Sequence, residues 1–192
     1  MTTSSSFQEA TFGFLTGRTA TGVLDGDRNA QLVVAYGASR RDPTRVDVAA
    51  AAKGLGVTRR SVQRWLAGGG ISPAHAAKLQ KTARQAMTTK RGRQRVMRAT
   101  RASKAAQRPP GKTGLRIGGV QGVLSGTTDA HRDRVTNVSF TDNDLEAMQD
   151  LWVEHGTAGA AAFLHQQMDQ HYCEGWQFLS VDDLDWGDST NY

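Results

Sequence analysis

Two runs of apolar residues at helical spacing lie between residues 46 and 66, and a glycine-containing turn separates them. The positions predicted to face inward are Ala51, Leu55, Val57, Val62 and Trp65. Ala52 is small enough for two helices to cross closely, and Gly56 tolerates the positive φ that a tight turn requires. The pattern therefore predicts a helix-turn-helix.

The pattern of apolar positions changes after residue 107. Before that point it predicts short helices over 7–36 and a helix over 73–107 that breaks near 88–92, whereas residues 1–6 are expected to be disordered. After Arg108-Pro109-Pro110 the pattern predicts a strand or hairpin at 114–124 and a strand at 135–140. It then predicts a helix at 142–154 capped by Thr141, a turn at 156–159, a helix at 160–172 and a closing strand at 176–186. The expected fold is α+β, with an all-α helix-turn-helix half followed by a β-β-α-α-β half.

Four segments follow from these changes of pattern. We expect a flexible, short-helical segment at 1–40 and a helix-turn-helix domain with a basic helical extension at 41–107. A Pro/Gly-rich linker and strand region follows at 108–133, and an acidic α+β domain at 134–192.

Charge is distributed very unevenly along the chain. Residues 53–112 hold 16 Lys and Arg and no Asp or Glu, whereas residues 113–192 hold 13 acidic residues against three Arg. Sixty residues without a carboxylate repel one another unless an anion compensates them, and nucleic acid is the commonest polyanion. A solvated helix face is the alternative interpretation, but such faces usually mix both signs.

The second helix of the predicted motif carries the side chains that read DNA. Thr58 is expected to cap it, and its outer face presents Arg59, Arg60, Gln63 and Arg64. These side chains contact base edges and phosphates in the major groove. Further DNA contacts are expected from Thr58 itself and, chiefly to phosphates, from Lys53, Lys90, Arg91, Arg93 and Arg95. A plain helical hairpin and a charged soluble linker are the structural alternatives for these two segments.

Composition and spacing argue against several other classes. One cysteine excludes a disulfide framework, and no segment has the length or apolarity of a membrane span or a signal peptide, so we expect a soluble protein of the cytoplasm without a membrane partner. His165 and His171 are six residues apart and fall on different helix faces, so no metal site is expected there. The aspartates at 182, 183, 185 and 188 leave a metal-dependent nuclease as a minor alternative, but strand alternation would separate Asp182 from Asp183 and Asp185.

The order of motifs resembles that of the telomere terminal proteins of linear actinobacterial chromosomes and plasmids. The resemblance covers roughly residues 30–186 and rests on AAKGLGVTRRSVQRWLAGG, the carboxylate-free helix, TGLRIGG, TTDAHRDRV and WQFLSVDDLDW. It implies a protein that binds telomeric duplex and single-stranded ends and primes DNA synthesis. A Ser or Thr hydroxyl would then become covalently attached to the 5′ end of the DNA.

The resemblance also implies which residues and partners take part. Thr113 would be the primed residue, because it follows the basic helix and the Pro-Pro break, with Ser125, Thr127 and Thr128 as alternatives. All four hydroxyls lie in glycine-flanked sequence that is expected to be flexible. The partners would be a DNA polymerase, which supplies the metals, and a telomere-associated protein, and the chain would lie with the nucleoid or a linear plasmid. It would need no cofactor and would not be an enzyme. A transcriptional or plasmid-replication regulator is the alternative function, since the helix-turn-helix alone suffices for it.

Overall fold

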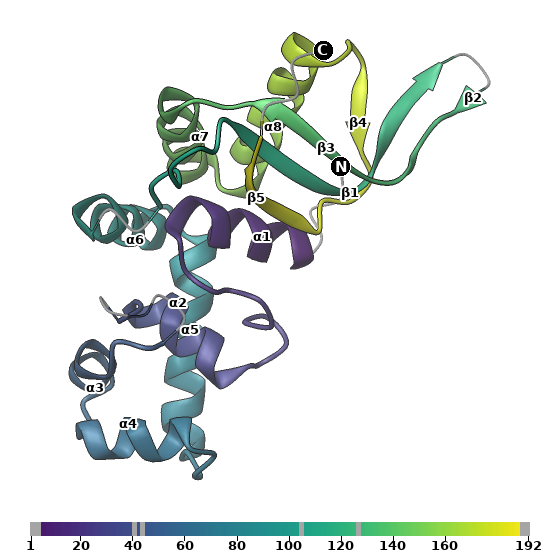
Figure 1. Cartoon of the computed structure of the whole chain (residues 1–192). Coiled ribbons are helices and arrows are strands. Elements are labelled where there is room, and N and C mark those ends of the chain that lie inside the picture. The colour runs from purple at the N-terminus through teal and green to yellow at the C-terminus, as the bar shows by residue number, and fades with distance from the viewer. Residues whose placement is uncertain (1–4, 40–41, 43–44, 104–105, 126–127, 189–192) are drawn as a thin grey trace. The chain divides into compact units, whose positions relative to one another are not determined.

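The computed structural model describes residues 5–39, 42, 45–103, 106–125 and 128–188 (Figure 1). The chain divides into two compact units: Thr16–Ala105, here the helical unit, and Met1–Leu15 together with Ala106–Tyr192, here the sheet unit. Of the segment expected to be disordered, residues 1–4 lie outside the described residues, whereas Ser5 and Ser6 begin a helix. Within the described ranges, no helix combines the length and apolarity needed to cross a membrane.

The helical unit contains five helices in its described part. They are α2 (Arg28–Tyr36), α3 (Val48–Leu55), α4 (Arg59–Leu66), α5 (Pro73–Thr88) and α6 (Lys90–Ser103). Helix α2 packs on α3 and α5, α3 packs on α4, and α5 packs on α6. The two helices predicted within 46–66 are confirmed, as is the broken helix over 73–107.

The break between α5 and α6 is a property of two threonines. The hydroxyls of Thr88 and Thr89 donate to the carbonyl oxygens of Arg84 and Gln85, at 2.9 and 2.8 Å, and compete there with the backbone N–H groups at the end of α5. Thr89 is extended (φ −99°, ψ 141°), and its Oγ1 accepts from the backbone N–H of Gly92 at 3.0 Å. The same residue therefore ends α5 and caps α6.

The sheet unit combines helices with an antiparallel sheet, so the predicted α+β fold class is confirmed. Its helices are α1 (Ser5–Thr16, whose last residue lies in the helical unit), α7 (Asp142–His155) and α8 (Thr157–His171). Its strands are β1 (Gly114–Ser125), β2 (Thr128–Asp129), β3 (Arg132–Ser139), β4 (Trp176–Phe178) and β5 (Asp183–Gly187).

Strand β1 is the centre of the antiparallel sheet. It pairs with β2 and β3 along one edge, and with β5 and then β4 along the other. The single closing strand expected at 176–186 is therefore wrong, because two strands, β4 and β5, lie there. The chain between them leaves strand geometry because the N–H groups of Leu179 and Ser180 both donate to the carbonyl oxygen of Val120. Gly119 (φ 144°) allows this approach, since a Cβ there would lie 2.5 Å from the Ser180 carbonyl oxygen.

One face of the sheet is covered by α7 and α8 (Figure 1). The buried strand residues Leu115, Ile117 and Val138 lie at this face. Helix α1 joins the same core, since Phe12 packs edge-on against Trp152 and Phe14 against Phe140, with ring centroids 5.9 and 5.8 Å apart. An N-terminal helix thus completes a core that the C-terminal residues form.

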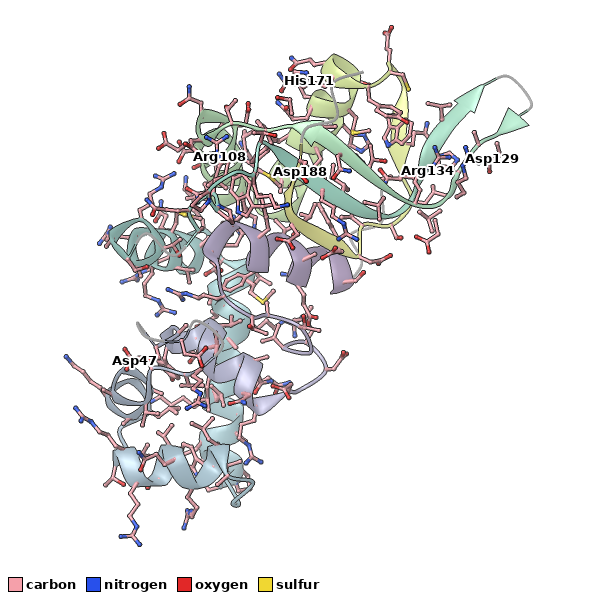
Figure 2. All side chains as sticks on the ribbon, in the orientation of Figure 1. Asp47, Arg108, Asp129, Arg134, His171 and Asp188 are labelled. Atoms are coloured by element: carbon pink, nitrogen blue, oxygen red, sulfur yellow. The ribbon has the colours of Figure 1, made fainter. Side chains whose placement is uncertain are left out.

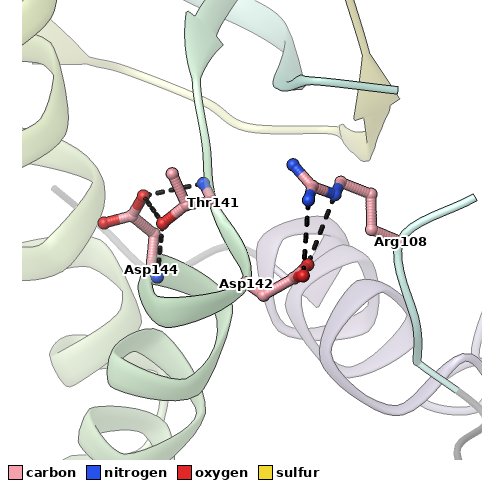
Figure 3. Close-up of polar contacts among 4 residues, drawn as sticks. All are labelled: Arg108, Thr141, Asp142 and Asp144. Carbon is pink, nitrogen blue, oxygen red and sulfur yellow. Dashed lines mark hydrogen bonds and ion pairs between the residues drawn. The ribbon is translucent and has the colours of Figure 1, made fainter. Parts of the chain in front are cut away.

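The cap predicted for α7 is present (Figure 3). The Thr141 hydroxyl oxygen accepts from the backbone N–H of Asp144, and the Asp144 carboxylate accepts from the backbone N–H of Thr141. Beside this capping box, the Arg108 Nε lies 3.3 Å from the Asp142 carboxylate. Acidic residues in the first turn and a reciprocal cap both stabilise a helix N-terminus. Both features lie within four residues of each other in the sequence, so the start of α7 could be predicted from it.

The turn expected at 156–159 is wrong, because α8 begins at Thr157, immediately after Gly156. Gly156 takes a positive φ of 67° and reverses the chain in a single residue. Gly159 then lets α7 and α8 approach closely, since a Cβ at that position would lie 2.3 Å from the Leu151 carbonyl oxygen. The second glycine serves helix packing rather than a turn.

Candidate nucleic-acid interface

The two helices of the motif begin and end at side chains suited to those positions. The Asp47 carboxylate accepts from the backbone N–H groups of Ala49 and Ala50 and so starts α3. Gly56 ends it in the left-handed conformation at φ 76°. The Thr58 hydroxyl then accepts from the Ser61 N–H at 3.1 Å and starts α4. The predicted turn and cap are both present.

The inward residues of the motif form a small core. Four of the five predicted positions are buried: Ala51, Leu55, Val62 and Trp65. Val57 in the turn is half-buried. Ala52 is also buried, in keeping with its predicted place at the crossing of α3 and α4. These contacts hold one face of α4 inward and so determine which face is outward.

The outward face of α4 carries the predicted reading residues. All four are exposed: Arg59, Arg60, Gln63 and Arg64. Lys53 in the last turn of α3 is exposed as well, and basic side chains extend outward from α3 and α4 (Figure 2). Thr58 is exposed, but its hydroxyl is engaged with Ser61. Helix α4 thus presents three guanidiniums and an amide side by side.

The rest of the helical unit extends the positive charge. The helical unit as a whole contains 19 Lys and Arg against four Asp, whereas the sheet unit contains five Lys and Arg against 14 Asp and Glu. The exposed cations on α5 and α6 are Lys78, Lys81, Arg84, Lys90, Arg91, Arg95, Arg98 and Arg101. These side chains could neutralise phosphates over a wide area.

Arg93 differs from its neighbours in α6. Its residue is only 6% exposed, and its guanidinium donates to the Thr88 carbonyl oxygen at 2.8 Å. This contact stabilises the C-terminal end of α5 at the α5–α6 junction. We therefore do not count Arg93 among the exposed cations of α5 and α6, which are called the basic surface from here on.

Arg28 is a positioning residue that the sequence pattern did not reveal. It is the first residue of α2, yet its Nη1 donates to the carbonyl oxygens of Trp65 and Gly69, at 3.0 and 2.8 Å. A cation is favourable at the C-terminal end of a helix, where backbone carbonyls lack partners. Arg28 thus links α2 to the end of α4. In the sequence it is one more arginine, and nothing local connects it to residues about 40 positions away.

Replacing Arg28 by alanine should lower the stability of the helical unit by about 1.5–3 kcal/mol, the usual range for hydrogen bonds to a charged group. The measurement is urea unfolding, with Arg45→Ala as a control because the Arg45 side chain forms an exposed ion pair with Asp42. The Arg45 variant should stay within about 0.5 kcal/mol of wild type. Equal stabilities of the two variants would contradict the role assigned to Arg28.

The candidate hydroxyls all lie in the sheet unit. Thr113 is exposed but stands at the start of β1, where its N–H donates to Gly187 and its carbonyl accepts from Phe140. The flexible placement expected for Thr113 is therefore wrong, because its backbone bonds to Gly187 of β5 and to Phe140 directly after β3. Ser125 and Thr128 face each other in the register of β1 and β2, and Thr127 lies outside the described residues. This end of the hairpin extends beyond the rest of the sheet (Figure 1).

Asp129 lies next to that hairpin end (Figure 2), where it pairs with His131. The Asp129 carboxylate accepts from the backbone N–H of His131 and contacts the His131 Nδ1, and these interactions lower the pKa of Asp129. Among the described residues, the buried His131 Nε2 has no hydrogen-bond partner. The pair fixes the start of the return strand.

The residues considered for metal binding do not come together. In the described part of the chain, no group of three His, Cys, Asp or Glu is placed to hold a metal ion. His165 instead lies with Nδ1 at 3.1 Å from the Trp176 carbonyl oxygen. Asp183 forms an ion pair with Arg116, and Asp188 with Lys112 at 3.3 Å, so both act as counter-ions within the unit.

Comparisons with protein families, with curated proteins and with solved structures give no match to this chain.

Proposed function

We propose that this protein binds duplex DNA by placing α4 in the major groove. The observation that carries the proposal is the exposed face of α4, where Arg59, Arg60, Gln63 and Arg64 stand on a helix whose opposite face is buried. Arginine recognises guanine through two hydrogen bonds, and glutamine recognises adenine in the same way. The basic side chains of α5 and α6 add affinity for phosphates without choosing a sequence.

The test is selection from random duplex DNA, followed by fluorescence anisotropy on the enriched site over a range of salt concentrations. We expect an enriched sequence and a slope of log affinity against log salt of about −4 or steeper, since each neutralised phosphate contributes about 0.9. Heparin is the control polyanion. Binding that enriches no sequence, and that heparin displaces as readily from every duplex, would contradict groove reading by α4.

The more specific function that we propose is protein priming of DNA synthesis, which the resemblance to telomere terminal proteins suggests. In that reaction a Ser or Thr hydroxyl oxygen bonds to the α-phosphorus of a deoxynucleoside triphosphate and pyrophosphate leaves. The hydroxyl proton passes to a base in the polymerase, whose metals assist the transfer. The DNA polymerase and a telomere-associated protein would be the partners, at telomeric DNA of the nucleoid or a linear plasmid.

The hydroxyls differ in how well they suit this step. A primer residue must enter the cleft of another protein, and a hairpin end that extends beyond its sheet can do so. Ser125 and Thr128 lie at such an end, and their glycine-flanked neighbour Thr127 belongs to the same segment. Thr113 is exposed, but its backbone would have to leave two strands. The geometry therefore favours Ser125 and Thr128 over Thr113.

Isolation of DNA from producing cells under strong denaturant, without protease, tests protein priming. We expect the polypeptide to stay attached, and nuclease digestion followed by mass spectrometry to leave one nucleotide on a peptide containing residues 125–128. A nucleotide on Thr113 would reverse the order of the candidates. Complete dissociation would refute priming and leave DNA binding untouched. A regulator that binds a palindromic site as two subunits would then be the better account.

A further inference from the structure

The chain that follows α4 turns back over the last turn of that helix. Gly68 takes a positive φ of 88°, and its N–H donates to the Trp65 carbonyl oxygen at 3.1 Å. The N–H of Gly69 donates to the Arg64 carbonyl oxygen at 2.8 Å. Together with the left-handed glycine, these two bonds form a Schellman motif. The motif brings Gly69 back to Arg64, which is one of the exposed residues on the outward face of α4.

Gly69 lies directly against the aliphatic stem of Arg64. A Cβ at position 69 would lie 2.5 Å from the Arg64 Cγ and 2.7 Å from the Arg64 carbonyl oxygen. In a Schellman motif a side chain at this position commonly contacts the residue that corresponds to Arg64. Here the glycine leaves that space to the arginine stem. The stem can therefore lie along the returning backbone while the residue as a whole stays exposed.

Arg28 holds this returning segment from a different helix. Its Nη1 donates to the Trp65 carbonyl oxygen at 3.0 Å and to the Gly69 carbonyl oxygen at 2.8 Å. Gly69 is thus bonded through its N–H to Arg64 and through its carbonyl oxygen to the first residue of α2. The backbone against which the Arg64 stem lies is therefore fixed at both of its polar groups.

A supported stem matters for an arginine that reads a base. Arginine has many rotamers, and a side chain that becomes ordered only on binding loses their entropy at that moment. Two parallel hydrogen bonds to a guanine edge also require the guanidinium to point in one direction. A stem that is held before DNA binds reduces the entropy cost and fixes that direction.

We propose that Gly69, held by Arg28, is a positioning residue for Arg64 and so determines base specificity where Arg64 meets the DNA. This inference rests on the proposed reading of duplex DNA by α4. Arg64 contacts the base, whereas Gly69 and Arg28 act only through Arg64. Specificity would therefore depend on a glycine outside the recognition helix.

The first arm of the test uses the full chain without DNA. NMR relaxation of arginine Nε–H groups reports side-chain motion on the picosecond-to-nanosecond timescale. We expect Gly69→Ala to make the Arg64 Nε–H more mobile than in wild type, because the added methyl group takes the space of the stem. Gly70→Ala adds the same methyl group where it meets no atom within 4 Å, and should leave Arg64 as in wild type. Equal mobility of Arg64 in all three proteins would overturn the proposal.

The second arm measures discrimination at single base pairs of the enriched duplex. Arg64→Ala and Arg60→Ala first identify the base pair that each arginine reads. Gly69→Ala should reduce discrimination at the Arg64 base pair by at least about fivefold, the lower end for one arginine–guanine contact. Discrimination at the Arg60 base pair should stay unchanged, and so should the salt slope, because no cation is removed. Gly70→Ala should discriminate as wild type does.

A double-mutant cycle separates positioning of Arg64 from a general distortion of α4. Once Arg64 is alanine, Gly69→Ala should cause no further loss of discrimination, since the side chain that it positions is gone. Arg28→Ala removes the support without adding a methyl group, and should reduce discrimination at the same base pair when measured well below its Tm. Thermal unfolding verifies that each variant is folded.

Two results of the second arm would overturn the proposal. One is an equal loss of discrimination at the Arg60 and Arg64 base pairs, and the other is an undiminished effect of Gly69→Ala when Arg64 is absent. If wild type binds no DNA, the proposed function fails. The first arm then decides by itself whether Gly69 holds Arg64.

Discussion

Replacing Arg60 and Arg64 together by alanine should weaken binding to the preferred duplex by roughly 30- to 25,000-fold, since each base-reading arginine contributes about 1–3 kcal/mol. Both side chains are exposed on α4, so the substitutions should leave the core formed by Val62 and Trp65 intact. Discrimination between the preferred and a scrambled duplex should fall at the same time. Anisotropy at one fixed salt concentration measures both effects, and thermal unfolding verifies that the variant folds.

Arg91→Ala is the matched comparison, because Arg91 is exposed on α6 and is expected to meet phosphate only. This variant should weaken binding to preferred and scrambled duplexes equally and reduce the magnitude of the salt slope by about 0.9. A double α4 variant that keeps its sequence preference would refute recognition by α4. The sequence preference would then have to come from another element.

Gly92→Ala should destabilise the helical unit by roughly 3 kcal/mol, the upper part of the range for overpacking a core. A Cβ at this position would lie 1.9 Å from the Gln85 carbonyl oxygen and 2.8 Å from the Thr89 hydroxyl oxygen. The Gln85 carbonyl oxygen is part of the backbone of α5, so the clash cannot be relieved by moving a flexible side chain. The helix preference of alanine over glycine returns only about 1 kcal/mol. Urea unfolding is the measurement.

Gly70→Ala is the control, since an added Cβ there meets no atom within 4 Å. It should change stability by less than about 0.5 kcal/mol. A Gly92 variant as stable as the Gly70 variant would mean that α5 and α6 separate at little cost. The α5–α6 junction would then not be the rigid support for the basic surface that the packing indicates.

Several features of the fold follow from residues close together in sequence. The helices of the motif, the glycine turn at Gly56, and the caps at Thr58 and Thr141 were all predictable, because each depends on side chains within four positions. The break between α5 and α6 belongs to the same class, since Thr89 bonds to Gln85 and Gly92. Local rules were insufficient at Gly159, where a glycine read as a turn residue lies inside α8.

The sequence by itself determined the α+β class, the helix-turn-helix and the separation of charge, because periodicity, capping and composition are local properties. Only the tertiary structure decided that α1 packs with Trp152, that Arg28 holds the end of α4, and that the closing strand divides in two. These contacts join residues far apart in the chain, and they depend on the packing of side chains and backbone groups in three dimensions, which no local pattern encodes.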